Sequence, residues 1–442
     1  MPKADLQRWL ERVLKSSPAD ATLTALTRQH SSLTRFANNT IHQNVAETQN
    51  SLMVRVDIGA RRGLATTTQL TDEGIRSVVE RACELARRAP ILPDRPLPPG
   101  PQHYPAAIRW DEPTAAATPH DRGERVARSI RLVAQANLTA AGYLATSSAT
   151  TVLANSNGLA ASHASTFAEF SLTVMGEDSS GWAKAKAPAL SELAIDQLTE
   201  QAIRTTELGR HPKELPAGSY PVILAPAATA DLISFLAGDF SGLAVLEQES
   251  CLTGKLGQSV FGPNITLVDD VTHPLQMGHP FDGEGMARRP VTLIDRGAVK
   301  SFVYSLTTAK KSGVQATGHG SAVEPDEYPL NLVLQGGDRS IEQLIASAER
   351  GLFLTRCWYI REVDPTQKIV TGMSRDGTFW IEGGKLRHGV KNLRFNQGLI
   401  AMLNDVEAMG PAVRAAGEEH DSCIVAPALK VRNFRFTGST PD

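Results

Sequence analysis

The sequence is poor in cysteine, in aromatic residues and in long hydrophobic runs. Among its 442 residues only four are cysteines, and no two of them form a C-x-x-C pair: Cys83, Cys251, Cys357 and Cys423. This spacing indicates neither a disulfide framework nor a four-thiolate zinc site, and it favours a reducing, cytoplasmic location. No stretch reaches the roughly 18 apolar residues that a membrane helix requires. Residues 1–17 have the pattern of an amphipathic helix rather than that of a signal peptide.

The chain also lacks an excess of positive charge. Lys and Arg number 45 and Asp and Glu number 47, so the formal net charge is −2, and no run of five basic residues occurs. A nucleic-acid-binding protein needs a basic face that neutralises phosphates. We therefore expect neither a nucleic-acid partner nor, from the missing apolar runs, a membrane partner.

The order of patterns along the chain predicts an α+β protein of two domains. Residues 1–215 combine amphipathic helices, such as 71–89 and 120–138, with strand patterns, and we expect an N-terminal α/β domain there. Residues 216–442 are rich in alternating runs joined by turns, which predicts a strand-rich, antiparallel, hairpin-built C-terminal domain with few helices. Two helices are expected within it, at residues 340–351 and 396–409.

Motifs of common catalytic sites are absent, which leaves isolated polar segments as candidates. The sequence has no G-x-S-x-G, no P-loop, no G-x-G-x-x-G after a strand and no H-E-x-x-H. Residues 269–284 hold His273, His279, Asp282 and Glu284, a composition that suits a divalent cation, although a polar loop between strands is the commoner meaning of such a segment. The 317–320 segment places His319 between two glycines, and His420 with Cys423 forms an H-x-x-C pair. Two ligands alone do not make a metal site.

A further candidate segment mixes charges with aromatic residues. It runs from Arg356 to Asp364 and continues from Thr371 to Gly377, and it includes Arg361 and Arg375. Arginines at strand ends are suited to gripping a peptide, and they equally form structural ion pairs that hold hairpins together. Spacing alone does not separate these two interpretations.

Several segments, taken in order, resemble the TldD/PmbA family of metallopeptidase-related proteins, formerly described as modulators of DNA gyrase. The similarity extends over nearly the whole chain and is carried by residues 53–63, 71–89, 220–224, 281–285, 291–304, 317–320 (T-G-H-G, where the family has T-G-N-G), 363–372, 379–385 and 427–431. In the catalytic TldD branch, the helix after the 220–224 strand carries H-E-x-x-x-H. Its two histidines bind zinc and its glutamate acts as general base.

This sequence departs from that motif at each of its three functional positions. The first histidine is Ser234, the glutamate is Phe235 and the second histidine is Asp239, whereas the glycine Gly238 is kept. Serine is a poor zinc ligand and phenylalanine cannot take a proton. TldD also contributes a C-terminal cysteine to the metal, but Cys423 lies closer to the last strand than that spacing implies, so the role is not carried over.

The resemblance therefore implies the PmbA branch, also called TldE, whose members lack the metal motif and pair with TldD to cleave small or unfolded peptides. We expect no catalytic residues and no metal in this chain, with zinc held by a TldD-type partner, and a dimer formed with that partner or with itself. The residues expected along a peptide channel are Asp282, Glu284, His319, Arg361 and Arg375. The weaker metal candidates are His279, His319 and Cys423. The alternatives are a self-sufficient peptidase with a relocated site and a peptide-binding scaffold without hydrolysis.

Overall fold

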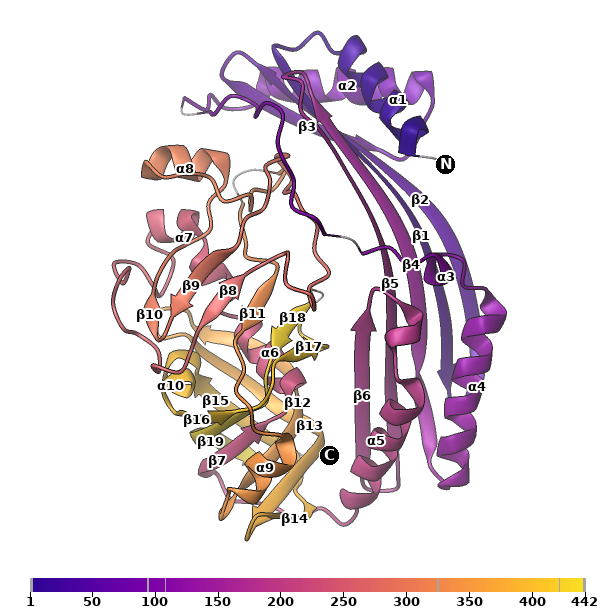
Figure 1. The fold of residues 1–442 in the computed structure, drawn as a ribbon, viewed down its shortest axis with the longest axis vertical. Helices are drawn as coiled ribbons and strands as arrows, with labels where there is room; N and C mark the ends of the chain where they lie inside the picture. Colours follow the sequence, from indigo (N-terminus) through magenta and orange to yellow (C-terminus); the bar gives the residue numbers. More distant parts are fainter. Residues whose placement is uncertain (1–2, 94, 108, 324–325, 421, 440–442) are drawn as a thin grey trace.

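The computed structural model describes residues 3–93, 95–107, 109–323, 326–420 and 422–439, and it has the predicted mixed α+β architecture (Figure 1). One long twisted sheet is built from residues before position 188, and two further sheets are built from residue 218 onward. We call these two parts the N-terminal lobe and the C-terminal lobe. Among the helices of the described residues, none combines the length and the apolar character that a membrane span requires.

The N-terminal lobe is a six-stranded sheet in the order β3-β2-β1-β4-β5-β6, antiparallel throughout. Its strands are β1 (Ala21–Ala37), β2 (Thr40–Ile58), β3 (Arg61–Thr67), β4 (Thr139–Asn155), β5 (Ala160–Met175) and β6 (Ser180–Ala187). Its helices are α1 (Lys3–Ser16), α2 (Asp72–Arg88), α3 (Glu112–Ala115), α4 (Pro119–Gln135), η1 (Leu190–Glu192) and α5 (Ile195–Leu208). Thr71 caps α2 and Thr118 caps α4, as side-chain acceptors at helix starts do.

Helices cover one face of this sheet in two separate groups. In one group, α1 packs on β1 and β4 and α2 packs on β2 and β3; in the other, α4 packs on β4, β1 and β2 and α5 packs on β5 and β6. On the opposite face, Leu23, Leu153 and Leu159 pack with Phe281 of the C-terminal lobe. The sheet therefore turns its second face toward the other lobe.

The C-terminal lobe contains two sheets with a shared hydrophobic core. One has the order β10-β9-β8-β11-β18-β17, and its strands are β8 (Leu267–Asp269), β9 (Val291–Asp295), β10 (Ala298–Val299), β11 (Leu332–Leu334), β17 (Val413–Ala415) and β18 (Ile424–Ala426). The other has the order β12-β7-β19-β15-β13-β14, with β16 beside β19; its strands are β7 (Gly218–Leu224), β12 (Arg350–Asp364), β13 (Ile369–Glu382), β14 (Lys385–Gly389), β15 (Leu393–Gly398), β16 (Val406–Met409) and β19 (Leu429–Ser439). Most pairings are antiparallel, and β11–β18 and β7–β12 are parallel.

The helices of this lobe are short, and both helices predicted from the sequence differ in extent. They are α6 (Pro226–Ser234), η2 (Ala237–Phe240), α7 (Gly242–Leu246), α8 (Leu306–Ser312), α9 (Ile341–Ala346) and α10 (Leu399–Asn404). The helix expected at 396–409 is only α10, because residues on either side pair in β15 and β16. The helix expected at 340–351 ends at Ala346, since residue 350 already belongs to β12. Within residues 291–304, β9 pairs with β10 at Ala298–Val299, and residues 302–304 belong to no named strand.

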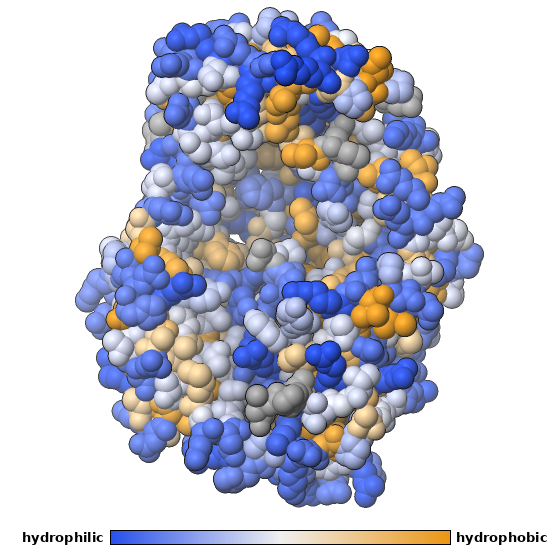
Figure 2. All heavy atoms as spheres, turned by 180° about the vertical axis from the view of Figure 1, so that it is seen from behind, coloured by the Kyte–Doolittle hydropathy of each residue, from blue (hydrophilic) through white to orange (hydrophobic). Residues whose placement is uncertain are grey.

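The two lobes meet across a hollow. In the space-filling view the molecular surface is hollowed near its middle, and apolar residues lie within the hollow (Figure 2). Residues 89–93, 95–107 and 109–111 run along this region without regular helix or strand, in a segment rich in proline. This segment reaches the C-terminal lobe, because Tyr104 donates a hydrogen bond from its hydroxyl to the carbonyl oxygen of Gly285 (2.9 Å).

Candidate functional site

The segment that matches the zinc-binding motif is a helix that stops at the first motif position. Helix α6 begins at Pro226 and ends at Ser234, and the 3-10 helix η2 follows at residues 237–240. The hydroxyl of Ser234 donates to the carbonyl oxygen of Asp231, 2.7 Å away. Phe235 packs against the core of the C-terminal lobe. The first two motif positions therefore offer one hydroxyl, already bonded to the backbone, and an apolar ring.

The third motif position, Asp239, is held by a lysine. Its carboxylate is buried, one oxygen accepts from the backbone N–H of Cys251 at 2.9 Å, and the other lies 2.6 Å from the ammonium of Lys368. Lys368 also pairs with Glu362 (2.5 Å), and these contacts raise the pKa of its ammonium despite its burial. The carboxylate of Asp239 therefore already has a cation as its partner, and that cation is not a metal ion. Ser234, Phe235 and Asp239 therefore do not fit a zinc ion.

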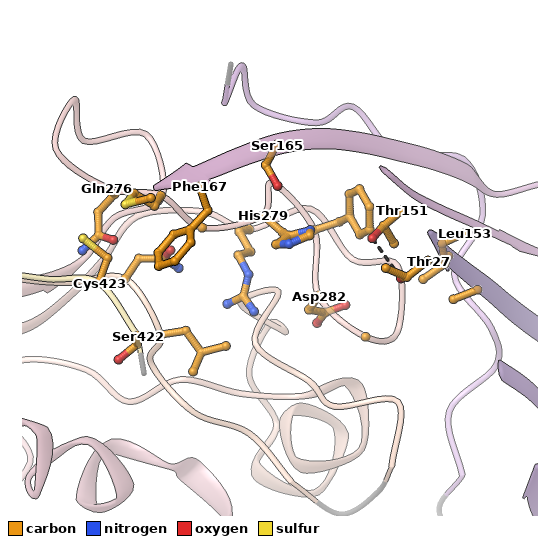
Figure 3. Close-up of a pocket in the computed structure, with 18 of the residues that line it drawn as sticks. Thr27, Thr151, Leu153, Ser165, Phe167, Gln276, His279, Asp282, Ser422 and Cys423 are labelled. Carbon is orange, nitrogen blue, oxygen red and sulfur yellow. Dashed lines mark hydrogen bonds between the residues drawn. The ribbon is translucent and has the colours of Figure 1, made fainter. Parts of the chain in front are cut away.

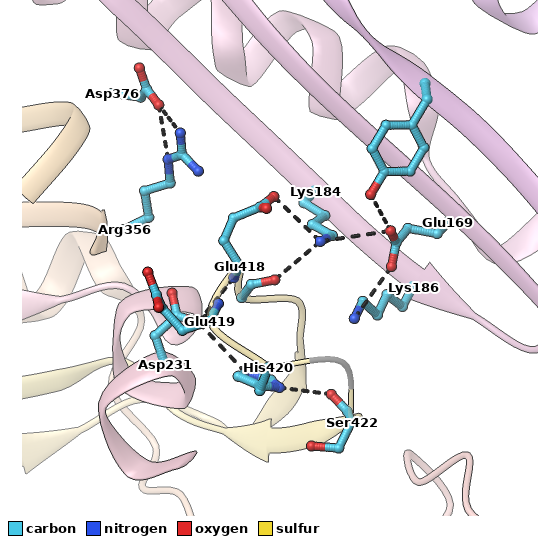
Figure 4. A network of polar contacts seen from close by, with 12 residues as sticks. Glu169, Lys184, Lys186, Asp231, Arg356, Asp376, Glu418, Glu419, His420 and Ser422 are labelled. Carbon is cyan, nitrogen blue, oxygen red and sulfur yellow. Dashed lines mark hydrogen bonds and ion pairs between the residues drawn. The ribbon is translucent and has the colours of Figure 1, made fainter. Parts of the chain in front are cut away.

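A small cavity of about 260 Å³ lies between the end of α6 and residues 419–424. Ser234 and Phe235 line it from one side, and His420 and Ser422 line it from the other. The imidazole of His420 is 3.8 Å from the carboxylate of Asp231, and its Nδ1 is 2.9 Å from the carbonyl oxygen of Ser422 (Figure 4). The H-x-x-C pair does not converge on one ion, because His420 faces this cavity and Cys423 lines the larger one described below.

Asp231 is the most perturbed carboxyl group beside this cavity. It lies on α6 without solvent exposure, and it accepts hydrogen bonds from the backbone N–H groups of Glu418 and Glu419. Burial raises its pKa to about 7, and the negative charges of Glu419 and Glu418 add to the rise, while the two backbone hydrogen bonds oppose it.

This raised pKa predicts how stability depends on pH. A folded-state value of about 7 lies above the ordinary 3.8, so the folded state binds the proton more tightly than the unfolded chain. The resulting stabilisation is complete below pH 4 and is lost as the pH rises through 7. An Asp231→Asn variant is neutral at every pH and keeps an acceptor oxygen. From pH 5 to pH 8 we expect the wild type to lose about 2–3 kcal/mol of unfolding free energy relative to this variant.

Urea denaturation at both pH values measures the difference. Because the imidazole of His420 lies 3.8 Å from the carboxylate of Asp231, both proteins are also compared in a His420→Gln background. A constant offset between wild type and variant at the two pH values would contradict the assignment of the proton to Asp231.

A larger cavity of about 670 Å³ lies between the face of the N-terminal sheet and the C-terminal lobe (Figure 3). Strands β1, β4 and β5 contribute Thr27, Thr151 and Phe167, and the opposite wall comes from residues 276–283, Arg288, Ala322, residues 330–331 and residues 422–423. The two cavities share Leu330 and Ser422, so they adjoin. The end of the degenerate motif helix is thus next to a cavity large enough for a small organic ligand.

Of the residues predicted to line a peptide channel, only Asp282 reaches this cavity. Its two carboxylate oxygens accept from the backbone N–H groups of Glu284, Met286 and Gly320, so it shapes the loop; burial raises its pKa. Glu284 is buried and accepts from the N–H of Leu306.

His319 is buried outside the cavity, with Nε2 2.9 Å from Asp269 and Nδ1 2.9 Å from the hydroxyl of Thr317. The pKa of Asp269 is lowered, because these contacts and the charge of Arg288 outweigh its burial. Arg361 and Arg375 stack on Tyr359 and Trp358, and neither lines the cavity.

The weaker metal candidates His279 and Cys423 do line the cavity, but no shared metal site results. The His279 ring lies 4.8 Å from that of His163, and burial lowers the pKa of both imidazoles, that of His163 to about 4. Burial raises the pKa of Cys423 to about 11, so it is a neutral thiol. Within the described residues, no group of three or more His, Cys, Asp or Glu side chains is arranged to hold a metal ion.

Sequence reasoning missed Asp231, His163, Gln276 and Arg288 among the residues beside the two cavities. Asp231 lies within an apolar helical run. An acidic residue in such a run is the one signal that the sequence offered for these positions. Arg288 is adjacent to the exposed Arg289, and nothing in the sequence distinguishes the two. Their contacts join segments far apart in the chain.

Comparisons with known proteins give one consistent result. Models of the PmbA/TldA metallopeptidases match in three consecutive parts: domain 1 at residues 25–86, the central domain at 110–209 and the C-terminal domain at 217–438. The metalloprotease PmbA of Escherichia coli O157:H7 is 23% identical over 84% of this chain and 83% of its own length. A metalloprotease TldD homologue of Haemophilus influenzae is 27% identical over 54% of this chain and 52% of its own length.

Solved structures show the same fold from end to end. The crystal structure of TldE from Thermococcus kodakarensis superposes with a TM-score of 0.88, at 21% identity, over 99% of both chains. A structure from Thermotoga maritima described as a putative modulator of a DNA gyrase superposes with a TM-score of 0.86, at 19% identity, over 98% of this chain and 100% of that one. At these identities the likeness establishes the fold.

Proposed function

This chain belongs to the PmbA/TldD metallopeptidase family, and from that premise we propose that it is the metal-free subunit of a two-chain peptidase that processes small or unfolded peptides. The observation that carries the proposal is the ion pair between Asp239 and Lys368. Together with Phe235 it leaves the motif helix with neither a ligand set nor a general base. The role left to this chain is to complete the assembly and to form part of the wall that the peptide meets.

The partner that fits is a homologue with an intact H-E-x-x-x-H, and a dimer with a second copy of this chain is the other arrangement. The cavity between the lobes supports a contribution to peptide binding, because it is open to a ligand and adjoins the motif helix. The alternative of a relocated site within this chain has less support, since Asp282 uses both carboxylate oxygens on backbone N–H groups. The four free thiols support a reducing compartment, and we place the protein in the cytoplasm.

Metal content and peptide hydrolysis, measured together, test this function. Purified alone, the chain is expected to hold far less than about one zinc per molecule and to leave a mixture of unfolded peptides uncleaved. Mixed with the motif-bearing homologue from the same source, it is expected to form a species of about 95 kDa, from the 47.5 kDa of this chain and a partner of similar mass. The mixture is expected to cleave peptides at least about tenfold faster than the homologue alone.

The control is the same mixture with the motif glutamate of the homologue replaced by glutamine, which should abolish hydrolysis. Stoichiometric zinc together with hydrolysis by this chain alone would contradict the proposal, and it would favour the relocated site. Absence of both association and stimulation would favour a scaffold without hydrolysis.

A further inference from the structure

The larger cavity is lined by a buried arginine that forms no hydrogen bond or ion pair through its side chain with the residues that the structure describes. Arg288 follows the 276–283 wall, and only 8% of its surface is exposed. Within the described residues, its Nη1 donates to no acceptor, and its guanidinium forms no ion pair with a carboxylate. A guanidinium buried without a partner is costly. Its position at the wall of a cavity makes an anionic ligand the natural counter-charge.

The other ionisable groups of the cavity are either neutral or already paired. The ammonium of Lys186 lies 3.3 Å from the carboxylate of Glu169. Burial lowers the pKa of His279, which packs against the ring of His163 outside the lining, and burial raises the pKa of the Cys423 thiol to about 11. Among the described residues that line the cavity, Arg288 is therefore the cation that remains for a ligand.

The nearby acids Asp282 and Asp269 do not neutralise Arg288 directly. The charge of Arg288 acts to lower the pKa of each of them, but neither forms an ion pair with it. The oxygens of Asp282 accept from three backbone N–H groups, and Asp269 pairs with His319. Both carboxylates are committed elsewhere, so the guanidinium keeps its donors.

A buried acceptor lies on the same cavity wall. Gln276 is 1% exposed, and its Nε2 donates to the carbonyl oxygen of Leu332 at 2.9 Å, which fixes the orientation of the amide. Among the residues that the structure describes, no donor reaches its buried Oε1 or the buried Oδ1 of Asn331, which also lines the cavity. These oxygens suit a ligand N–H. The sheet side of the cavity supplies apolar surface from Met53, Leu153 and Phe167.

We propose that this cavity binds an apolar amino-acid residue that carries a free α-carboxylate and an acylated N–H, with the carboxylate on Arg288 and the N–H facing Gln276. Arginine binds a carboxylate through two parallel hydrogen bonds, which gives both charge neutralisation and orientation. Two sources have this chemistry: the C-terminal residue of a peptide and a free N-acyl amino acid. The peptide source rests on the proposed function, whereas the free source does not.

Isothermal titration of the full chain alone, without any partner, tests the site with three probes. These are a pentapeptide that ends in phenylalanine with a free carboxylate, the same peptide as its C-terminal amide, and N-acetylphenylalanine. The free acid is expected to bind at least about tenfold more tightly than the amide. Tight binding of the pentapeptide acid alone assigns the peptide source, and similar binding of N-acetylphenylalanine assigns the free source.

Substitutions distinguish the contribution of the Arg288 guanidinium to binding from that of the other residues that line the cavity. Arg288→Met should abolish the preference for the acid over the amide, and Arg288→Lys should keep part of it. Arg289→Met is the matched control. The side chain of Arg289 is exposed and bonds to Gln315 outside the cavity, so this variant should bind the probes like the wild type. Ser165→Phe, which fills the cavity from β5 without altering Arg288, should weaken binding of every probe.

Loss of fold is excluded as an explanation by thermal unfolding, since removing an unpaired buried charge should leave the melting temperature of Arg288→Met at or above that of the wild type. Equal affinities of the wild type for acid and amide, an unchanged acid preference in Arg288→Met, or no binding of any probe would each overturn the proposal. Because no partner is present in the titration, these outcomes are independent of whether the two-chain peptidase exists.

Discussion

Replacing Lys368 by methionine is expected to lower the free energy of unfolding by about 3–5 kcal/mol. The Lys368 ammonium is the counter-ion of Asp239, whose carboxylate is buried in the C-terminal lobe, and it also binds Glu362 at the edge of the same site. Methionine keeps the length of the side chain but leaves an unpaired charge inside the protein. The backbone of Lys368 has a positive φ of 54°, a strain that both residues share, so it cancels in the comparison.

Urea denaturation followed by tryptophan fluorescence measures this effect, and a second substitution identifies its cause. In the Lys368→Met/Asp239→Asn double variant the buried charge is gone, while the asparagine oxygen still accepts from the N–H of Cys251. About 2 kcal/mol should be recovered relative to the single variant. If the double variant is no more stable than Lys368→Met, the ion pair is not what holds this motif position.

The second large effect is expected from Asp376→Asn, at about 3 kcal/mol of unfolding free energy. Asp376 pairs with the buried Arg356, whose Nε donates to it at 2.9 Å (Figure 4), and it also accepts from Ser180 of the N-terminal lobe. Arg356 lies over the ring of Trp182 from that lobe as well. The substitution therefore weakens contacts that join the two lobes.

Asparagine is chosen because it tolerates the left-handed backbone of this position, where φ is 52°. The measured loss of unfolding free energy thus comes from removal of the carboxylate charge rather than from backbone strain. Glu407→Gln is the matched control on a partly exposed ion pair with Arg432 (3.0 Å), and it should change stability by less than about 1 kcal/mol. Equal effects of the two substitutions in urea denaturation would show that the Arg356–Asp376 pair is no stronger than a surface pair.

Local signals in the sequence were sufficient to predict most of the fold. The α+β class is confirmed, and so is the helix predicted at residues 71–89, which extends from Asp72 to Arg88. The helix expected at 396–409 was wrong in extent. Residues 393–398 alternate like a strand, but the apolar run after them extends the helical pattern backward over them. Their pairing with β13 and β19 makes them a strand, and the helix begins only at Leu399.

The candidate site was predictable only as far as the motif positions. The resemblance located Ser234, Phe235 and Asp239, but not the lysine that pairs with Asp239, because Lys368 lies far along the chain on the turn between β12 and β13. Arg288 has the same limitation. An arginine becomes exceptional only when the carboxylates near it are bound to other groups, as Asp282 and Asp269 are, and that is a property of the folded packing rather than of the local sequence.

The order of pairing in the N-terminal sheet has a consequence for synthesis on the ribosome. Strand β1 pairs on one side with β2, which follows it directly, and on the other side with β4, which begins at Thr139. After β2 ends at Ile58, a further 80 residues must be translated before β4 begins, which takes roughly 4–16 s at about 5–20 residues per second. During that interval the nascent β1–β2 hairpin exposes one long edge of unpaired backbone groups. This edge is paired only after β4 has been synthesised, so the N-terminal sheet is completed well after its first two strands have formed.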